Sequence, residues 1–509
     1  MRTNNQVTRR RFTQACTAAA VLGRTTFCAE GPNAAIHKAM DAVRAGIAKA
    51  ESDPDRPAYH FRPPAQWNND PNGVIFYKGW HHLFYQHNPF EAKWGHMHWG
   101  HARSRDLVNW EHLPIALWPS LEKGEEHVFS GGAILGADGR PRLFYTSIGK
   151  REPEQWMAAP VDDELIVWEK HSHNPIATVR LHGRQRIYDW RDPFLFREAA
   201  RTYMVTGGNG NERRQGGASA VYLYEAVNSD LSEWKYLGPV FEYRNREVIN
   251  IECPNLFKLG SRWVLLISPQ KPCEYFVGDL DLARRKFVPD TYGVLDPGHS
   301  YASNVSFDDH GRCILWLWGR TETNPEKGWN SVMVMPRILT IGDDGYLRQN
   351  PAPEFDRLRG EMRKAPAAPL GAKPLSLSET VSGDSLEIQA DFTLDNTRAV
   401  GLRLRSPASG KGFQVGYGPS AVFNDGMFSA GSAATLLGRV SRLRIRVFLD
   451  KCVAEAYAND GAAAIFTTVD AGPNDLGIEA YAEGGTARLD SFQAWPLKPA
   501  RFSLDRFRA

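Results

Sequence analysis

The chain has 509 residues, of which 42% are hydrophobic and 23% are charged, a composition typical of soluble globular proteins with about two folded units. Five of its 61 basic residues lie within residues 1–29, which contain no acidic residue, and the remaining chain holds 56 basic against 58 acidic residues. This balance excludes the basic footprint of a nucleic-acid-binding protein. No apolar run reaches 18 residues, so the sequence predicts no membrane span.

Residues 1–29 begin the chain with an Arg-rich segment. The stretch TRRRFTQACTAAAVLG places Arg9 and Arg10 before Phe12 and a short Ala-rich run. This pattern resembles a twin-arginine export signal, and the alternative is a disordered basic tail. We therefore expect an exported protein, periplasmic or extracellular, whose signal covers residues 1–29.

Residues 30–54 are predicted to hold one helix and a lead-in to the next domain. Ile36, Met40, Val43 and Ile47 recur at helical spacing. The helix is expected to pack on the outside of the domain that follows. The six cysteines of the chain show neither metal-ligand spacing nor a dense disulfide framework.

Residues 55–350 read almost entirely as strands and turns, and one unit recurs. Each unit is an apolar strand, a polar turn and a second apolar strand, followed by further β-rich sequence, so each repeat offers about four strands. Four-stranded units repeated radially form a β-propeller, and five hairpins predict five blades; the alternative is a long β-sandwich with coincidental spacing. The hairpins are GVIFYKGWHHLFYQHNP from Gly73, GAILGADGRPRLFYTSIG from Gly132, PFLFREAARTYMVTGG from Pro193, NLFKLGSRWVLLIS from Asn255 and NVSFDDHGRCILWLWG from Asn304.

A Pro- and Ala-rich segment over residues 351–375 is typical of a linker. Residues 376–509 contain short alternating strands such as SLEIQADFTL and RLRIRVFLD, which predict a C-terminal β-sandwich domain. The predicted fold class is therefore all-β: a five-bladed β-propeller followed by a C-terminal β-sandwich, with a short N-terminal helix. The sandwich holds no comparable acidic cluster, so it is expected to lack chemistry of its own.

Three carboxylates occupy equivalent positions, immediately before the first, third and fourth hairpins. They are Asp70, Asp192 and Glu252. The first strand of each propeller blade lines the central channel, so residues at this position should converge at one mouth of it. Three converging carboxylates repel one another, and at least one should have a raised pKa. Such a group suits glycoside cleavage, which needs a carboxylic acid on one side of the bond and a carboxylate on the other.

Two other interpretations of these polar residues remain. Each acid could cap a turn or bind a neighbouring backbone amide. A metal site is the second alternative, since WGHMHWGH offers His96, His98 and His101. No tight ligand motif stands out, so a metal is not expected.

Taken together, these motifs resemble glycoside hydrolase family 32, the invertases, levanases, inulinases and related β-fructofuranosidases. The stretch HFRPPAQWNNDPNG looks like the family's Trp-x-Asn-Asp-Pro-Asn-Gly box, although Asn68 stands where an apolar residue is usual. The segments HLFYQHNP, FSGG, WRDP, IECPNLF, YASNVSF and KGWNSVMVMPR also correspond to family motifs. The resemblance runs from residue 58 to residue 498, and it implies a five-bladed propeller with a C-terminal sandwich.

The resemblance implies a separate role for each acid. Asp70 would be the nucleophile, Glu252 the general acid/base, and Asp192 the carboxylate that holds the substrate in its transition state. It further implies retention of configuration, a fructose-containing saccharide as substrate and no cofactor. The substrate-binding residues carried over from matching boxes are Trp67, Asn69, Gln86, Trp94, Phe129, Ser130, Arg191, Asp296 and Trp318.

The favoured prediction is a retaining glycoside hydrolase that releases fructose from sucrose, levan or inulin through a covalent intermediate. A fructosyltransferase of the same family would keep all three acids. A non-catalytic sugar-binding propeller would not need an acid/base pair, and a propeller hydrolase acting on arabinose polymers is a further alternative. The sequence leaves open which fructoside is cleaved, whether attack is exo or endo, and the oligomeric state.

Overall fold

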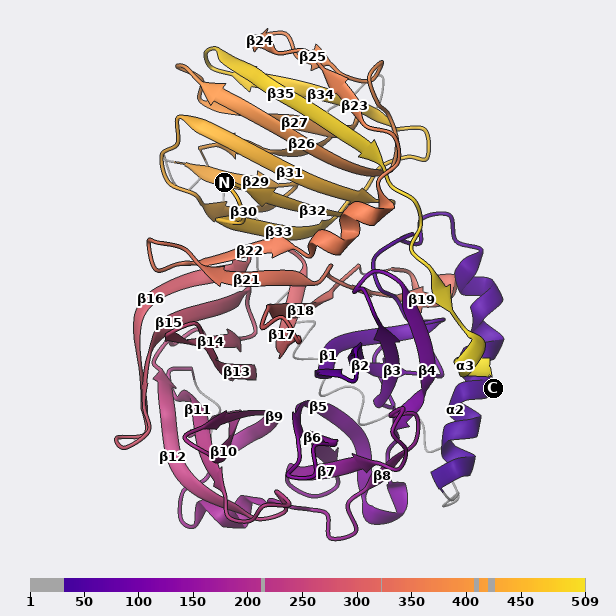
Figure 1. Cartoon of the computed structure of the whole chain (residues 1–509), viewed down its shortest axis with the longest axis vertical. Coiled ribbons are helices and arrows are strands. Elements are labelled where there is room, and N and C mark those ends of the chain that lie inside the picture. Colours follow the sequence, from indigo (N-terminus) through magenta and orange to yellow (C-terminus); the bar gives the residue numbers. More distant parts are fainter. Residues whose placement is uncertain (1–31, 212–215, 322, 407–411, 420–425, 509) are drawn as a thin grey trace, which may run out of the picture.

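A computed structural model of the chain describes residues 32–211, 216–321, 323–406, 412–419 and 426–508. Figure 1 shows a ring of sheets with a two-sheet sandwich stacked against one side of it. The expected export signal lies outside the described residues. Within them, no helix is both long and apolar enough to cross a membrane.

Five sheets in the described part of the chain surround a common centre (Figure 1), and each contains four consecutively paired antiparallel strands. The first holds β1 (Gln66–Tyr77), β2 (Trp80–Asn88), β3 (His98–Ser104) and β4 (Trp110–Leu117). The second holds β5 (Glu125–Leu135), β6 (Pro141–Gly149), β7 (Glu154–Pro160) and β8 (Trp168–Lys170). The third holds β9 (Tyr188–Glu198), β10 (Arg201–Asn209), β11 (Ser219–Ala226) and β12 (Trp234–Tyr243). The fourth holds β13 (Glu252–Leu259), β14 (Arg262–Ser268), β15 (Cys273–Asp281) and β16 (Lys286–Asp296). The fifth holds β17 (Ser300–Phe307), β18 (Cys313–Gly319), β21 (Arg337–Ile341) and β22 (Leu347–Pro351), with β20 (Val332–Met333) paired to β18.

The ring is closed by a strand that follows the fifth sheet's first hairpin. This strand, β19 (Trp329–Asn330), pairs in parallel with β1, so that Gln66 lies opposite Trp329. Adjacent sheets bury their faces against each other; Phe196 of β9, for example, packs with Leu256 of β13 in one core cluster. These features are those of a β-propeller, and the prediction of a propeller followed by a sandwich is confirmed.

The innermost strand of every sheet has a bulge near its start. The register shifts fall at residues 68–71 in β1, 128–131 in β5, 191–194 in β9, 252–255 in β13 and 301–304 in β17. Asp192, Cys253 and Ala302 have φ of 62°, 45° and 52° there, a left-handed conformation that is unfavourable for these residues. A bulge re-aims the side chains around it. The turn formers next to Asp70 therefore serve a bulged strand at the channel mouth rather than a surface turn.

Two further sheets form the C-terminal sandwich. One contains β23 (Arg363–Ala365), β24 (Ala368–Leu370), β26 (Ser385–Leu394), β31 (Arg442–Asp450), β32 (Val453–Ala458), β33 (Ala463–Thr468) and β35 (Ala487–Pro496). The other contains β25 (Leu375–Ser376), β27 (Ala399–Ser406), β28 (Phe413–Gly418), β29 (Met427–Ala430), β30 (Ala433–Leu436) and β34 (Gly477–Glu483). One apolar cluster, which includes Ile388, Leu402 and Ile445, fills the space between them.

The segment predicted as a linker, residues 351–375, has structure of its own. It contains the 3-10 helix η4 (Pro353–Leu358) and the strands β23 and β24, both of which pair with β35 of the sandwich. Short strands at the edge of a sheet tolerate the prolines of this segment. The remaining 3-10 turns are η1 (Leu121–Lys123), η2 (Val179–His182) and η3 (Pro325–Lys327).

A buried ionic cluster joins the propeller to the sandwich. His60 Nδ1 lies 2.8 Å from Asp450 Oδ2, and His60 Nε2 lies 3.1 Å from Glu455 Oε1. Arg337 bridges Glu455 over 3.0 Å and Asp296 over 2.9 Å. All five side chains are fully buried. Because His60 and Arg337 of the propeller pair with Asp450 and Glu455 of the sandwich, the cluster ties the two domains to one another.

The two ends of the described chain meet on the outer edge of the first sheet (Figure 1). Helix α2 (Pro32–Glu51), the expected N-terminal helix, buries Ala39, Met40 and Val43. Strand β36 (Phe502–Ser503) pairs in parallel with β4, and α3 (Asp505–Arg508) follows it. Arg44 of α2 donates to the carbonyl of Phe507 over 3.1 Å.

Candidate active site

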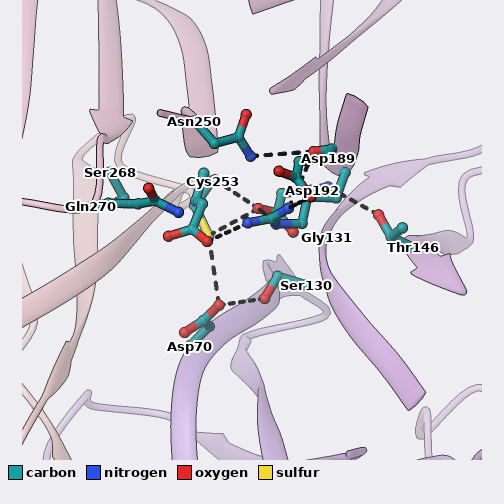
Figure 2. A network of polar contacts seen from close by, with 12 residues as sticks. Asp70, Ser130, Gly131, Thr146, Asp189, Asp192, Asn250, Cys253, Ser268 and Gln270 are labelled. Atoms are coloured by element: carbon teal, nitrogen blue, oxygen red, sulfur yellow. Dashed lines mark hydrogen bonds and ion pairs between the residues drawn. The ribbon is translucent and has the colours of Figure 1, made fainter. Parts of the chain in front are cut away.

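A chain of hydrogen bonds ends on the carboxylate of Asp70, in the bulged part of β1. Trp67 Nε1 donates to Asn69 Oδ1 over 2.7 Å. Asn69 Nδ2 in turn donates to Asp70 Oδ1 over 3.0 Å and to Gln86 Oε1 over 2.6 Å. Gln86 Nε2 donates to Ser130 Oγ over 2.9 Å. Ser130 donates to Asp70 Oδ2 over 2.5 Å, a contact that Figure 2 shows. Both oxygens of Asp70 therefore accept a hydrogen bond, and each donor is itself fixed by a neighbour.

The surroundings of Asp70 act on its pKa in opposite directions. Burial raises this pKa, because it removes the ionised carboxylate from water. The hydrogen bonds from Ser130 and Asn69 lower it, and the nearby charge of Glu252 raises it again. The net effect is a pKa above the ordinary value for Asp, although Ser130 and Asn69 both donate to the carboxylate.

Asp192 lies in the bulge of β9 and is 5% exposed. Its Oδ2 accepts the backbone N–H of Cys253 over 3.0 Å, and its own N–H donates to Thr146 Oγ1 over 2.9 Å. Burial raises the pKa of Asp192; Arg191 opposes this effect and Glu252 adds to it, and the result is a pKa of about 7. A carboxyl group with so high a pKa is a marker of a functional site.

Glu252 begins β13 and is held from two sides. Arg191 forms an ion pair with Oε1, and the hydroxyl of Tyr301 lies 2.5 Å from Oε2. The same hydroxyl lies 2.9 Å from the carbonyl of Ser268 and accepts the N–H of Gln270 over 2.9 Å. A tyrosine has a single hydroxyl proton, so Tyr301 donates either to Glu252 or to Ser268. When Tyr301 donates to the carbonyl of Ser268, a protonated Glu252 can donate to the Tyr301 oxygen. The same geometry therefore suits both the ionised and the protonated carboxyl of Glu252.

The three carboxylates belong to one network (Figure 2). The thiol of Cys253 lies 3.6 Å from Asp70 Oδ2 and 3.8 Å from Asp192 Oδ2. Arg191 connects Glu252 to this pair, because it forms an ion pair with Glu252 and its Nε lies 3.7 Å from Asp192 Oδ2. Residues that are far apart in the sequence are thus brought together at the mouth of the channel, as the blade repeat predicts.

Aromatic side chains occupy two sides of this network. Trp67 meets Trp318 edge to face, with ring centroids 5.7 Å apart. Trp318 is only 7% exposed, so little of its ring is open to a ligand. Trp94 is 39% exposed and lies 6.2 Å from Phe129, also edge to face. Phe129 directly precedes Ser130, so this second pair lies beside the hydrogen bonds to Asp70.

The structure does not place Asp296 at this site, and its expected role in substrate binding is wrong. Its side chain is fully buried. One oxygen accepts the N–H of Gly298 over 2.8 Å, and the other accepts the N–H of Phe466 over 2.9 Å and pairs with Arg337. A carboxylate with no exposed atom and these partners acts in the joint between the domains.

Sequence reasoning missed three groups that touch the acids: Tyr301, Cys253 and Thr146. Two of them carried a usable signal, because Tyr301 and Cys253 lie in the short segments that precede the fifth and fourth hairpins. Thr146 carried none. It lies at the C-terminal half of β6, and only the packing of β6 beside β9 brings it to Asp192.

The histidines considered as metal ligands have other partners. His101 Nε2 lies 3.0 Å from His82 Nδ1, and His98 Nδ1 lies 2.5 Å from the carbonyl of His96. In the part of the chain that the structure describes, no group of three or more His, Cys, Asp or Glu residues is arranged to hold a metal ion.

A propeller that gathers carboxylates in different environments at its channel mouth, between aromatic faces, defines a carboxylate-dependent glycoside hydrolase. Comparisons with known proteins agree. The model of the glycosyl hydrolases family 32 N-terminal domain matches residues 60–351, and that of the family 32 C-terminal domain matches residues 354–496. Together they cover well over half of the chain. The chain belongs to glycosyl hydrolase family 32.

Individual relatives support this assignment. The chain is 30% identical to a sucrose-6-phosphate hydrolase of Zymomonas mobilis over 92% of its own length and 97% of the relative's. It is 28% identical to a levanase of Bacillus subtilis, over 87% of this chain and 70% of the levanase. The crystal structure of fructan 1-exohydrolase IIa from Cichorium intybus has the same fold, with a TM-score of 0.79, 24% identity, and coverage of 88% of this chain and 98% of that one.

Proposed function

We propose that this glycoside hydrolase releases fructose from β-fructofuranosides of the sucrose, levan or inulin type, with retention, through a covalent fructosyl-enzyme intermediate. Family membership and the names of the relatives, a levanase and a sucrose-6-phosphate hydrolase, support the fructosyl substrate. The observation that carries the mechanism is the one-directional hydrogen-bond chain from Trp67 to Asp70. It gives Asp70 two donors and leaves it the role of an acceptor, as an ionised nucleophile requires.

In the first step, a carboxylate oxygen of Asp70 attacks the anomeric carbon of the fructosyl group. The bond from that carbon to the leaving oxygen breaks, and Glu252 transfers its proton to this oxygen. In the second step, Glu252 takes a proton from water, the water oxygen attacks the same carbon, and Asp70 leaves as a carboxylate. The contact with Tyr301 supports this cycle because it accommodates both states of Glu252.

Asp192 is proposed to bind hydroxyl groups of the fructosyl ring. Its ionised form would strengthen such hydrogen bonds as positive charge develops on the sugar in the transition state. Arg191 lies between Asp192 and Glu252 and fixes their separation. Gln86 and Ser130 orient the groups around Asp70, and Trp67, Trp94 and Phe129 offer flat faces for sugar rings.

The experiment that tests the function is incubation of the purified protein with sucrose, levan and inulin, with free fructose and oligosaccharides resolved by chromatography. We expect free fructose from at least one of them, initially as the β-anomer by NMR. Asp70→Asn should release none. Release of the α-anomer first, or no fructose from any of the three, would overturn the proposal.

We also propose that residues 1–29 direct export by a twin-arginine route. The support is the sequence alone: Arg9 and Arg10 precede an Ala-rich run. Replacing both with Lys should keep the protein in the cytoplasm, as measured by cell fractionation. Unchanged amounts outside the cytoplasm would contradict this assignment.

A further inference from the structure

A guanidinium group without a carboxylate partner lies beside Tyr301, the residue whose hydroxyl contacts the acid/base. Arg320 directly follows β18, and its Cζ lies 5.7 Å from the ring centroid of Tyr301 and 5.9 Å from that of Trp318. Its Nε donates to the carbonyl of His299 over 3.2 Å. Among the described residues, no carboxylate lies within ion-pair distance of Arg320, although most other half-buried arginines have one. Its terminal nitrogens are therefore available as donors.

Arg320 lies on the side of the site where the departing saccharide is bound in the first step. Tyr301 is the residue whose hydroxyl contacts Glu252 over 2.5 Å, and the same ring lies beside Arg320. Because Glu252 protonates the oxygen of the departing saccharide, that saccharide must lie on the side of Glu252. Trp318 connects Arg320 to Trp67, so the wall of the site continues from the nucleophile to this cation.

The sandwich domain fixes Arg320 in place through one residue. The backbone N–H of Arg320 donates to the carbonyl of His299 over 3.0 Å, so His299 holds both its backbone and its side chain. His299 in turn donates its N–H to the carbonyl of Phe466 over 2.8 Å, and its Nδ1 lies 3.1 Å from Thr468 Oγ1. Phe466 and Thr468 belong to β33, which lies on the side of the sandwich that faces the propeller in Figure 1.

The contact between the two domains at this point is close. A Cβ added to Gly319, the residue before Arg320, would lie 2.6 Å from the ring of Phe466. A Cβ on Gly298, the residue before His299, would lie 1.9 Å from the carbonyl oxygen of Phe466. Only glycine fits at both positions, so β33 packs directly against the two segments that carry Arg320 and His299.

We propose that Arg320, held by the sandwich through His299, binds oxygen atoms of the departing saccharide and sets the preference of the enzyme for its leaving group. This proposal rests on the proposed function. A guanidinium presents several N–H groups in one plane, which suits neighbouring hydroxyl oxygens or, more strongly, the oxygens of a phosphate ester. The sandwich then contributes to specificity without supplying a residue to the fructosyl site itself.

The test compares three leaving groups in the wild-type enzyme and in Arg320→Gln. Sucrose and sucrose 6-phosphate have leaving groups rich in oxygen, whereas a nitrophenyl β-fructofuranoside has an aryl group. Loss of hydrogen bonds from a charged donor should lower kcat/KM for sucrose by about tenfold or more, mainly through KM. The aryl substrate should change by less than about twofold. A larger loss for sucrose 6-phosphate than for sucrose would identify phosphate as the preferred acceptor, and equal losses would identify hydroxyl groups.

Two controls separate binding from general damage. Arg348→Gln breaks an exposed pair with Asp344 in the same sheet and should leave both substrates unaffected. Arg320→Lys keeps the charge without the planar donors and should recover only part of the loss. Equal losses on sucrose and on the nitrophenyl fructoside, or no loss on either, would overturn the proposal. If the wild-type enzyme releases no fructose from any of these substrates, the failure belongs to the proposed function instead.

The role of the sandwich has its own test. Thr468→Val removes the contact with His299 and should raise KM for sucrose by less than Arg320→Gln does, with the aryl substrate unchanged. The double variant should lose no more than Arg320→Gln alone, because Thr468 acts through Arg320. Additive losses would show that Thr468 acts independently and would contradict the positioning route.

Discussion

The indole N–H of Trp67, 2.7 Å from Asn69 Oδ1, determines how hydrogens are arranged around Asp70. An indole nitrogen can only donate, so Asn69 must present its amide oxygen to Trp67 and its NH2 group to Asp70 and Gln86. Gln86 then accepts with its oxygen and donates with its nitrogen to Ser130. Ser130, having accepted one hydrogen bond, donates its proton to Asp70. A single donor therefore sets the polarity of the whole chain.

Trp67→Phe tests this polarity. The ring is kept and the N–H is lost, so the amide of Asn69 can turn over and present its oxygen to Asp70. We expect kcat to fall by about tenfold or more, since the nucleophile would face an acceptor instead of a donor. Steady-state kinetics on sucrose measure this change. An unchanged kcat with only a raised KM would show that Trp67 serves as a sugar platform alone.

The nucleophile and the acid/base are distinguished by chemical rescue. Glu252→Ala should lose most activity on sucrose, whose leaving group needs a proton, and retain the first step on a nitrophenyl fructoside. Added azide should speed its second step, because azide attacks the intermediate without base assistance and yields a fructosyl azide. Asp70→Ala should give no fructosyl azide of retained configuration, since no other group forms the covalent intermediate. Product analysis by mass spectrometry and NMR measures this, and a β-fructosyl azide from Asp70→Ala would contradict the assignments.

The three acids were predictable because chemistry and repeat coincide in the sequence. Asp70, Asp192 and Glu252 each precede a hairpin, and equivalent positions of a propeller meet at the channel. The bulges that aim them there were not predictable, because a bulge depends on the register with the next strand. The turn-forming residues around Asp70 indicated a break in regular structure, but not that the break occurs inside β1.

Contacts between the domains account for the remaining differences. Asp296 matched a family motif by position, yet its partners are Arg337 and the backbone of β33, which lies 170 residues further along the chain. Arg320 is a common residue type without a distinctive pattern. Its role follows from neighbours that only the folded chain brings together, and no local periodicity records such contacts.

Asp192 should destabilise the protein at neutral and alkaline pH. Its pKa of about 7 exceeds the ordinary value of 3.8, so between these values the folded state binds a proton that the unfolded state has lost. The free energy of unfolding therefore falls as pH rises through this window, and the penalty is complete above pH 7. Asp192→Asn should stabilise the protein at pH 8 by about 2–4 kcal/mol and have no such effect near pH 4. Urea unfolding of both proteins at the two pH values measures this, and equal effects at both would contradict it.

The cluster around His60 should hold the domains together over a defined pH range. Burial alone would lower the pKa of His60, but its hydrogen bonds with Asp450 and Glu455 raise the pKa to about 9. This contribution to stability is complete below pH 6.5 and is lost as pH rises through 9. Burial alone would raise the pKa of Glu455, but Arg337 and His60 lower it to about 2, so its contribution is lost as pH falls from 4.5 to 2.

His60→Gln measures the strength of this cluster. Removing one member of a buried charge network leaves the others uncompensated, so we expect a loss of about 3–5 kcal/mol at pH 6. The gap between wild type and variant should narrow as pH rises through 9. Asp344→Asn, which breaks the exposed pair with Arg348, is the control and should cost less than about 1 kcal/mol. A gap that stays constant from pH 6 to pH 10 would show that the charge on His60 does not contribute.

Tyr301→Phe tests the partner of the acid/base. Burial and the charge of Glu252 raise the pKa of Tyr301 well above its ordinary value, so the hydroxyl stays protonated and acts as a hydrogen-bond partner rather than as a base. Without it, Glu252 keeps only Arg191 and its proton has no fixed acceptor. We expect kcat on sucrose to fall by about tenfold. On a nitrophenyl fructoside, whose leaving group needs little protonation, the rate of the first step should fall by less than about twofold, as measured by the burst of nitrophenol. Equal losses on the two substrates would mean that Tyr301 supports the fold of the site and not the proton transfer.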